Sequence, residues 1–145
     1  MLSKKTRYAM LAMAALAREY GRGTLSASRI AETEHVPQRV LEAILLKLKN
    51  RGCIGSTRGK TGGYYLMRPP QEITLLEIVE MFGGAVSMLA CICADDDYRP
   101  CEFCKDEATC TIRSTFSAIY SQTAEILRRT MLSDLADNAE KQNLE

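Results

Sequence analysis

Five of the six cysteines in this 145-residue chain lie within 20 residues of one another, and thiolates are ligands for zinc and for iron–sulfur clusters. These are Cys91, Cys93, Cys101, Cys104 and Cys110. A small secreted protein held together by disulfides would spread its cysteines along the whole chain, so this clustering indicates a metal or redox site. Four thiolates suit tetrahedral zinc as well as an iron–sulfur cluster, so the spacing leaves the metal open. Disulfide formation is a further reading.

The remaining chemistry-bearing residues do not assemble a catalytic set. Cys53 precedes a short apolar strand, where a thiol is most simply a small buried core residue. His35 is the only histidine, so neither a Ser–His–Asp nor a Cys–His arrangement with further histidines is available. We therefore expect a protein that is not an enzyme.

The charges of the chain are separated into two halves. The formal net charge is +1, from 19 Lys and Arg against 18 Asp and Glu. Residues 1–68 contain 13 basic and 4 acidic side chains, a net of +9, whereas residues 69–145 contain 6 and 14, a net of −8. A positive half of this kind indicates a polyanionic partner such as DNA, which the overall balance alone would dismiss.

The elements of the basic half have the order of a winged helix-turn-helix. Apolar spacing and glycine stops predict helices over 4–20, 26–33 and 37–50, with Pro37 at the first position of the third helix. Two extended segments, 53–57 and 63–67, follow and are joined by a basic, glycine-rich loop. In this arrangement the third helix enters the major groove and the loop, the wing, approaches the DNA backbone or minor groove.

The predicted DNA contacts fall into three groups. Arg58 and Lys60 lie on the wing, between glycines that allow close approach to a duplex. The third helix exposes side chains early in its course that can read bases, namely Gln38, Arg39 and Glu42. Further basic side chains can neutralise phosphates, and these are Lys4, Lys5, Arg7, Arg29 and Arg51, together with Arg39.

The acidic half is expected to contain a sensor segment and a long helix. Thr74 can cap a helix over 75–82, the aperiodic cysteine segment follows, and a last helix is predicted from about Thr111 to Leu135. That helix has an apolar stripe that needs a partner surface, formed by Ile112, Phe116, Ile119, Thr123 and Ile126. The expected division is a DNA-binding domain (1–70), a helix and cysteine loop (71–110), a dimerisation helix (111–137) and a polar tail (138–145).

No segment is expected to anchor the chain in a membrane. The longest apolar run, 9–17, is far shorter than the ~20 residues that span a bilayer. Its spacing follows an amphipathic core helix more closely than a signal peptide. We therefore expect a cytoplasmic protein without a membrane partner.

Several of these motifs together resemble the bacterial winged-helix regulators that include the iron–sulfur-cluster regulator IscR, the nitric-oxide sensor NsrR, the iron regulator RirA and the cysteine-metabolism regulator CymR. The most specific match is the wing, RGKTGGYYL at 58–66. TRYA at 6–9 is similar to the opening of this family, and VLEAILLKL at 40–48 to its recognition helix. ITLLEIV at 73–79 resembles the helix after the wing, and TMLSDL at 130–135 the end of the dimerisation helix.

The resemblance implies a mostly α-helical fold with a small β-hairpin wing and a long C-terminal dimerisation helix. It also implies a homodimeric repressor or activator that binds a near-palindromic operator in double-stranded DNA. Cluster-binding members of the family use three cysteines of one loop, which correspond here to Cys91, Cys104 and Cys110. Arg113 stands where some members have a histidine ligand, and a guanidinium cation cannot ligate a metal.

Cys101 is our choice for the fourth ligand, because it pairs with Cys104 in a CxxC motif. Cys93 could substitute for Cys91 or Cys101, and the cluster could contain two or four irons. The expected function is a transcriptional regulator, with repression favoured, that senses iron–sulfur status, nitric oxide or redox state. One alternative is the same regulator with zinc or a thiol–disulfide switch. A different class, a small iron–sulfur electron-transfer protein, explains the cysteines but not the basic half.

Overall fold

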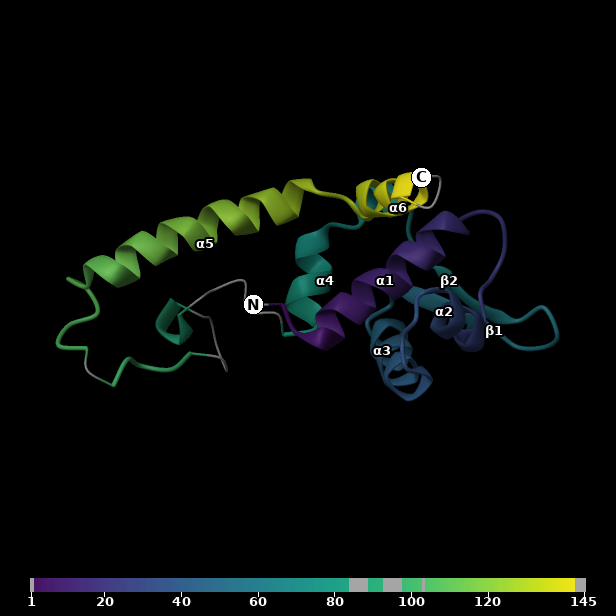
Figure 1. The fold of residues 1–145 in the computed structure, drawn as a ribbon, viewed down its shortest axis with the longest axis horizontal. Helices are drawn as coiled ribbons and strands as arrows, with labels where there is room; N and C mark the ends of the chain where they lie inside the picture. The colour runs from purple at the N-terminus through teal and green to yellow at the C-terminus, as the bar shows by residue number, and fades with distance from the viewer. Residues whose placement is uncertain (1, 84–88, 93–97, 103, 143–145) are drawn as a thin grey trace.

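The chain folds into a mostly helical body from which one long helix projects (Figure 1). The computed structural model describes residues 2–83, 89–92, 98–102 and 104–142. The basic half contains α1 (Lys4–Arg18), α2 (Ala27–Thr33), α3 (Gln38–Asn50), β1 (Ile54–Thr57) and β2 (Gly63–Leu66). The acidic half contains α4 (Leu75–Met81), α5 (Thr111–Arg129) and α6 (Leu132–Gln142). Two short 3₁₀ turns are η1 (Pro70–Glu72) and η2 (Ala90–Ile92).

Hydroxyl side chains begin three of these helices, because they accept hydrogen bonds from backbone N–H groups that have no partner inside the helix. The hydroxyl of Ser3 accepts from the N–H of Thr6 at 3.1 Å, and that of Ser26 accepts from the N–H of Arg29 at 3.2 Å. Thr74 caps α4 in a reciprocal box with Glu77. Pro37 is the residue before α3 rather than its first residue, so the predicted start of that helix is one residue too early.

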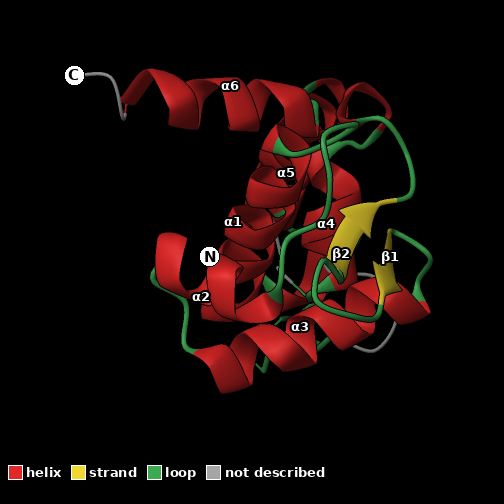
Figure 2. Cartoon of the chain, turned by 90° about the vertical axis from the view of Figure 1, so that its right-hand side faces the viewer, coloured by secondary structure: helices red, strands yellow, loops and turns green. Residues whose placement is uncertain are grey.

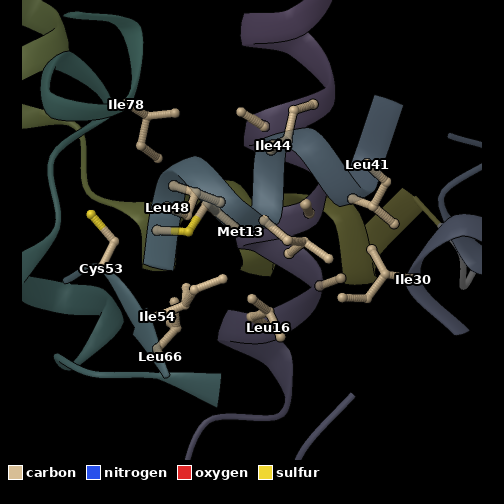
Figure 3. Packing of buried hydrophobic residues seen from close by; sticks show 14 of the residues in the cluster. Met13, Leu16, Ile30, Leu41, Ile44, Leu48, Cys53, Ile54, Leu66 and Ile78 are labelled. Carbon is tan, nitrogen blue, oxygen red and sulfur yellow. The ribbon is translucent and has the colours of Figure 1, made fainter. Parts of the chain in front are cut away.

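The core lies between α1, α3 and the hairpin (Figure 3). Met13 and Leu16 of α1 are buried against the apolar stripe of α3, which consists of Leu41, Ile44, Leu45 and Leu48. Cys53 is 8% exposed and belongs to the same cluster, which confirms the sequence-based prediction of a core thiol. Burial raises the pKa of the Cys53 thiol, and the nearby Arg68 guanidinium opposes that effect only in part.

The two strands form an antiparallel hairpin in which Ile54 pairs with Leu66 and Thr57 with Gly63. The predicted strands, 53–57 and 63–67, are each confirmed except for one residue at an end. Leu25 extends the sheet by a bridge to Tyr64, whose N–H donates to the carbonyl of Leu25 at 2.7 Å. A Cβ atom at Gly63 would lie 2.5 Å from the Leu25 carbonyl oxygen, so this close approach requires glycine.

The single helix predicted from Thr111 to Leu135 is wrong, because the chain leaves helical geometry at Thr130 and Met131. These residues lie beside the segment that enters α4. The N–H of Leu75 donates to the carbonyl of Thr130 at 2.9 Å, and the N–H of Leu132 donates to that of Ile73 at 2.8 Å. The carboxylate of Asp134 then accepts from the N–H of Met131 at 2.8 Å, which begins α6.

The C-terminal helix belongs to the body rather than to a free tail. α6 runs to Gln142, so the polar tail predicted from residue 138 is also wrong up to that point, and residues 143–145 lie outside the described part. Leu132 and Ala136 are buried as α6 packs on α1, on the side of the body away from α3 (Figure 2). Within the described ranges, no helix has the length and apolar character that a membrane crossing requires.

Candidate nucleic-acid interface and cysteine cluster

A helix-turn-helix presents the predicted base-reading side chains to solvent. α2 and α3 pack through the fully buried Ile30 and Leu41. The turn between them is closed by a hydrogen bond of 3.0 Å from the N–H of Val36 to the carbonyl of Ala31. Because α3 buries its apolar stripe, its opposite face is exposed from its first turn onward. Gln38, Arg39 and Glu42 are all exposed on this helix, as predicted.

Two of these side chains are joined before any DNA is bound. The amide nitrogen of Gln38 lies 3.2 Å from a carboxylate oxygen of Glu42 and 3.4 Å from the hydroxyl of Ser28 on α2. Gln can pair with adenine in the major groove, and Glu can accept a hydrogen bond from the cytosine amino group. The arrangement therefore holds an acceptor and a donor at the face of α3 that a groove would meet.

The wing loop, 58–62, extends Arg58 and Lys60 into solvent. Its fold depends on glycine, since Gly59 has a φ of 108° and a Cβ atom at Gly62 would lie 2.5 Å from the carbonyl oxygen of Thr57. The hydroxyl of Thr24 donates to the carbonyl of Thr61 at 2.8 Å and ties the loop to the segment before α2. The two cations are thus held at the tip of an anchored hairpin.

The predicted phosphate contacts on the helices are exposed as well: Lys4, Lys5, Arg7, Arg29, Arg39 and Arg51. The sequence interpretation missed Lys49, whose ammonium lies 2.7 Å from the hydroxyl of Ser56 and so connects α3 to the first wing strand. Its place off the apolar stripe indicated an exposed charge, but the contact with β1 depends on tertiary packing. All of these assignments to DNA stay predictions.

An ion pair connects the end of the wing to the start of α4. A guanidinium nitrogen of Arg68 lies 2.9 Å from one carboxylate oxygen of Glu77. The other oxygen accepts from the N–H of Thr74 at 2.9 Å. Burial alone would raise the pKa of Glu77, but the hydrogen bonds from Thr74 and Arg68 outweigh it and lower the pKa below its ordinary value. The sequence interpretation did not include this pair.

The cysteines occupy the segment that leads to α5, at the far end of that helix from the body (Figure 1). Cys91 lies in η2, and it is half-buried like Cys104 and Cys110, whereas Cys101 is exposed. All four are free thiols. Cys93, the possible substitute ligand, lies outside the described residues.

Arg113 joins two of these cysteines. Its Nε donates to the carbonyl of Cys91 at 3.2 Å, and its backbone N–H donates to the sulfur of Cys110 at 3.4 Å. A guanidinium nitrogen also lies 3.8 Å from a carboxylate oxygen of Glu107. Cys110 is the residue before α5, so its thiol lies at the positive end of that helix, where negative charge is favourable. Arg113 therefore positions Cys91 and Cys110 at one site without being a ligand.

Cys101 and Cys104 form a second pair, closed by a hydrogen bond of 3.1 Å from the N–H of Cys104 to the carbonyl of Cys101. Partial burial raises the pKa of the Cys104 thiol, and the neighbouring thiols of Cys110 and Cys101 raise it further. In the described part of the chain, however, no three side chains of His, Cys, Asp or Glu converge as a metal site would require. Four unbridged thiols in one segment suit a thiolate-bound group by their chemistry, while their convergence stays a prediction.

The apolar stripe of α5 is open along its length. Ile112 is 62%, Ile119 43% and Ile126 66% exposed, and Phe116 and Thr123 are half-buried. α5 is described throughout, and Ala124 is its only buried residue. Exposed isoleucines at this spacing are typical of a helix that packs against another chain.

Three helices, a two-stranded wing and an exposed basic face together define a winged-helix transcriptional regulator. The family model Rrf2, described as an iron-dependent transcriptional regulator, matches residues 2–138. The chain belongs to this family, and it is therefore a DNA-binding regulator and not an enzyme. Family membership confirms the resemblance inferred from the wing and the recognition helix.

Individual relatives agree over almost the whole chain. A putative HTH-type regulator, rrf2-like, of Rhodobacter capsulatus is 34% identical over 138 residues, which cover 93% of this chain and 91% of the relative. The structure of CymR, the global cysteine regulator of Bacillus subtilis, aligns with a TM-score of 0.77 at 30% identity, covering 95% of this chain and 97% of CymR. The structure of IscR from T. potens aligns with a TM-score of 0.74 at 25% identity, covering 98% and 90%.

Proposed function

We propose that this protein is a homodimeric repressor whose affinity for a near-palindromic operator is controlled by an iron–sulfur cluster bound to Cys91, Cys101, Cys104 and Cys110. The observation that carries this proposal is the attachment of both Cys91 and Cys110 to Arg113 at the start of α5. A site for a thiolate-bound group at this position would change with the position of the long helix. Such a regulator acts in the cytoplasm, where DNA is present.

Dimerisation is supported by the open stripe of α5. Ile112, Ile119 and Ile126 expose apolar surface that a second copy of the helix can cover. Two-fold symmetry then places two recognition helices on successive major grooves, ~34–36 Å apart, which explains why a near-palindromic operator is expected. Arg58 and Lys60 of each wing would add contacts with phosphates on either side of the groove.

The chain offers a mechanical route from the cysteines to the wing. Arg113 holds the Cys91 segment on α5, and the residues after α5 pair with the segment from Ile73 to Leu75. Arg68 and Glu77 connect that segment to the end of β2. When bound, an iron–sulfur cluster supplies the sensing chemistry, because its stability depends on iron supply, redox state and nitric oxide. A change in the cysteine segment would re-aim α5 and so alter the separation of the two recognition helices.

The proposal is tested by the metal and sulfide content of protein purified without oxygen and reconstituted with iron and sulfide. We expect visible charge-transfer bands with iron and acid-labile sulfide, and loss of both in Cys91→Ser, Cys104→Ser and Cys110→Ser. Cys53→Ala is the matched control, since its thiol is buried in the core away from the segment. Cys101→Ser and Cys93→Ser distinguish which of the two thiols is the fourth ligand.

A zinc or thiol–disulfide switch is the second candidate, because the similar CymR is named as a cysteine regulator and all described cysteines here are free thiols. Zinc bound without sulfide, or a colourless protein whose thiols oxidise reversibly, would replace the cluster with this alternative. The electron-transfer alternative is not supported, since the chain belongs to a family of transcriptional regulators.

A further inference from the structure

A pocket of about 410 Å³ lies between the first turn of α1, the exposed side of α3 and the end of α4. This volume falls within the ~300–1,000 Å³ that is usual for small-molecule sites. Apolar groups supply part of its lining, contributed by Val40, Ala43, Ile44 and Phe82, and three cations supply the rest, namely Lys5, Arg39 and Lys47. The DNA contacts and the cysteine cluster leave the apolar part of this pocket without a role.

The three cations make the pocket attractive to an anion. Among the ion pairs of the described ranges, none involves Lys5, Arg39 or Lys47, so no carboxylate neutralises them there. The ammonium of Lys47 lies 5.2 Å from the centre of the Phe82 ring, within the range of a cation–π contact. This contact holds the charge beside an aromatic surface instead of leaving it free in solvent.

We propose that this pocket binds a small organic anion with a planar apolar body. The anionic group would pair with Lys5, Arg39 and Lys47, while the body would pack on Phe82 and Val40. A bare phosphate would use only the cations and leave the apolar lining uncovered, so the apolar surface favours an organic ligand. Because Arg39 is also a predicted DNA contact, the ligand and DNA compete for the pocket side of α3. This competition rests on the DNA-binding role of α3, whereas ligand binding itself does not.

The test uses 8-anilinonaphthalene-1-sulfonate, an aromatic anion whose fluorescence rises in apolar sites, with the full-length protein. We expect saturable binding of one probe per chain. Lys47→Glu should weaken it about tenfold, because a close attraction becomes a repulsion. Lys49→Glu is the matched control: it makes the same charge change on the same helix, outside the pocket, and should change the affinity less than about twofold. Equal effects of the two variants, or no saturable binding, would overturn the proposal.

Two further measurements separate the parts of the inference. Phe82→Leu keeps an apolar side chain but removes the ring, so it should lower the affinity for the probe while inorganic phosphate competes only weakly with it. A probe that phosphate displaces as readily as an organic anion would contradict an apolar binding surface. Random-sequence duplex DNA should displace the probe. If the protein binds the probe but not DNA, the proposed function fails and the pocket stands; if DNA binds without displacing the probe, the predicted competition is wrong.

Discussion

At the scale of single residues, the wing is held by contacts that leave its two cations free for DNA. Gly59 and Gly62 allow the turn, and Thr24 fixes the loop from the neighbouring segment. Arg58 and Lys60 make no ion pair within the described structure, so their charges are available to phosphates. An anchored loop loses little conformational entropy on binding, which makes each phosphate contact more favourable.

Replacing both wing cations tests this assignment. Arg58→Ala with Lys60→Ala should weaken binding to every duplex, specific or random, and should reduce the salt slope of log K by about 1.8, the value for two lost phosphate contacts. The measurement is fluorescence anisotropy over a salt series. Arg128→Ala with Lys141→Ala removes the same charge from the C-terminal helices and is the control. An unchanged slope in the wing variant would show that the wing does not contact DNA.

Residue chemistry also explains which predictions the sequence supported. Ser3, Ser26 and Thr74 are local capping signals, and the glycines of the wing have a local steric cause, so both could be predicted from neighbouring residues. Arg113 could be recognised as a residue that is not a ligand. Its hydrogen bond to the carbonyl of Cys91, 22 positions earlier in the chain, could not be predicted, because no periodic pattern marks such a contact.

At the scale of elements, the break between α5 and α6 is the largest difference from the predicted architecture. The apolar spacing continues through Thr130 and Met131, so the pattern favours one helix. The backbone instead pairs with the segment from Ile73 to Leu75, which lies more than fifty positions away in the sequence. Asp134, three residues after Met131, is the one local signal of a new helix start. This junction attaches the long helix to the winged-helix body.

The ion pair between Arg68 and Glu77 gives this junction a dependence on pH. A carboxyl with a lower pKa in the folded than in the unfolded chain releases its proton more readily when folded. Its contribution to stability is therefore complete above the unfolded pKa, about 4.3, and is lost as the pH falls through the lower folded value. Glu77→Gln should reduce the free energy of unfolding at pH 7, and the difference from wild type should shrink below about pH 4.

Urea denaturation at a series of pH values measures this difference. Glu72→Gln is a suitable control, because Glu72 is exposed and meets Arg68 through its backbone carbonyl rather than its carboxylate. A difference between Glu77→Gln and wild type that stays constant from pH 7 to pH 3 would contradict a stabilising role of the ionised Glu77 carboxylate.

At the scale of the whole molecule, the two charged halves have separate positions. The basic half forms the body that presents α3 and the wing, and α5 carries the cysteine segment away from it (Figure 1). This separation keeps the acidic residues of the sensor segment from repelling DNA phosphates at the interface. The near-zero net charge of the chain is thus the sum of two regions with different roles.

The open stripe of α5 predicts that the protein is a dimer. Ile119→Glu with Ile126→Glu should convert it to a monomer, because two carboxylates would have to be buried at each end of an apolar contact. Sedimentation equilibrium measures the mass, and circular dichroism confirms that helices are retained. Glu80→Gln, an exposed change on α4, should leave the mass unchanged. A wild-type protein that is monomeric at high micromolar concentration would contradict this prediction.

The most direct test compares the DNA affinity of the same protein with and without its cluster. A duplex selected from a random pool supplies the operator, and anisotropy measures its dissociation constant for anaerobically reconstituted protein and for protein stripped by a chelator. Coupling between a sensor and a DNA site is typically 5–150-fold, so we predict a change of at least about fivefold that Cys110→Ser abolishes. Equal affinities in the two states would contradict control of DNA binding by the cysteine cluster.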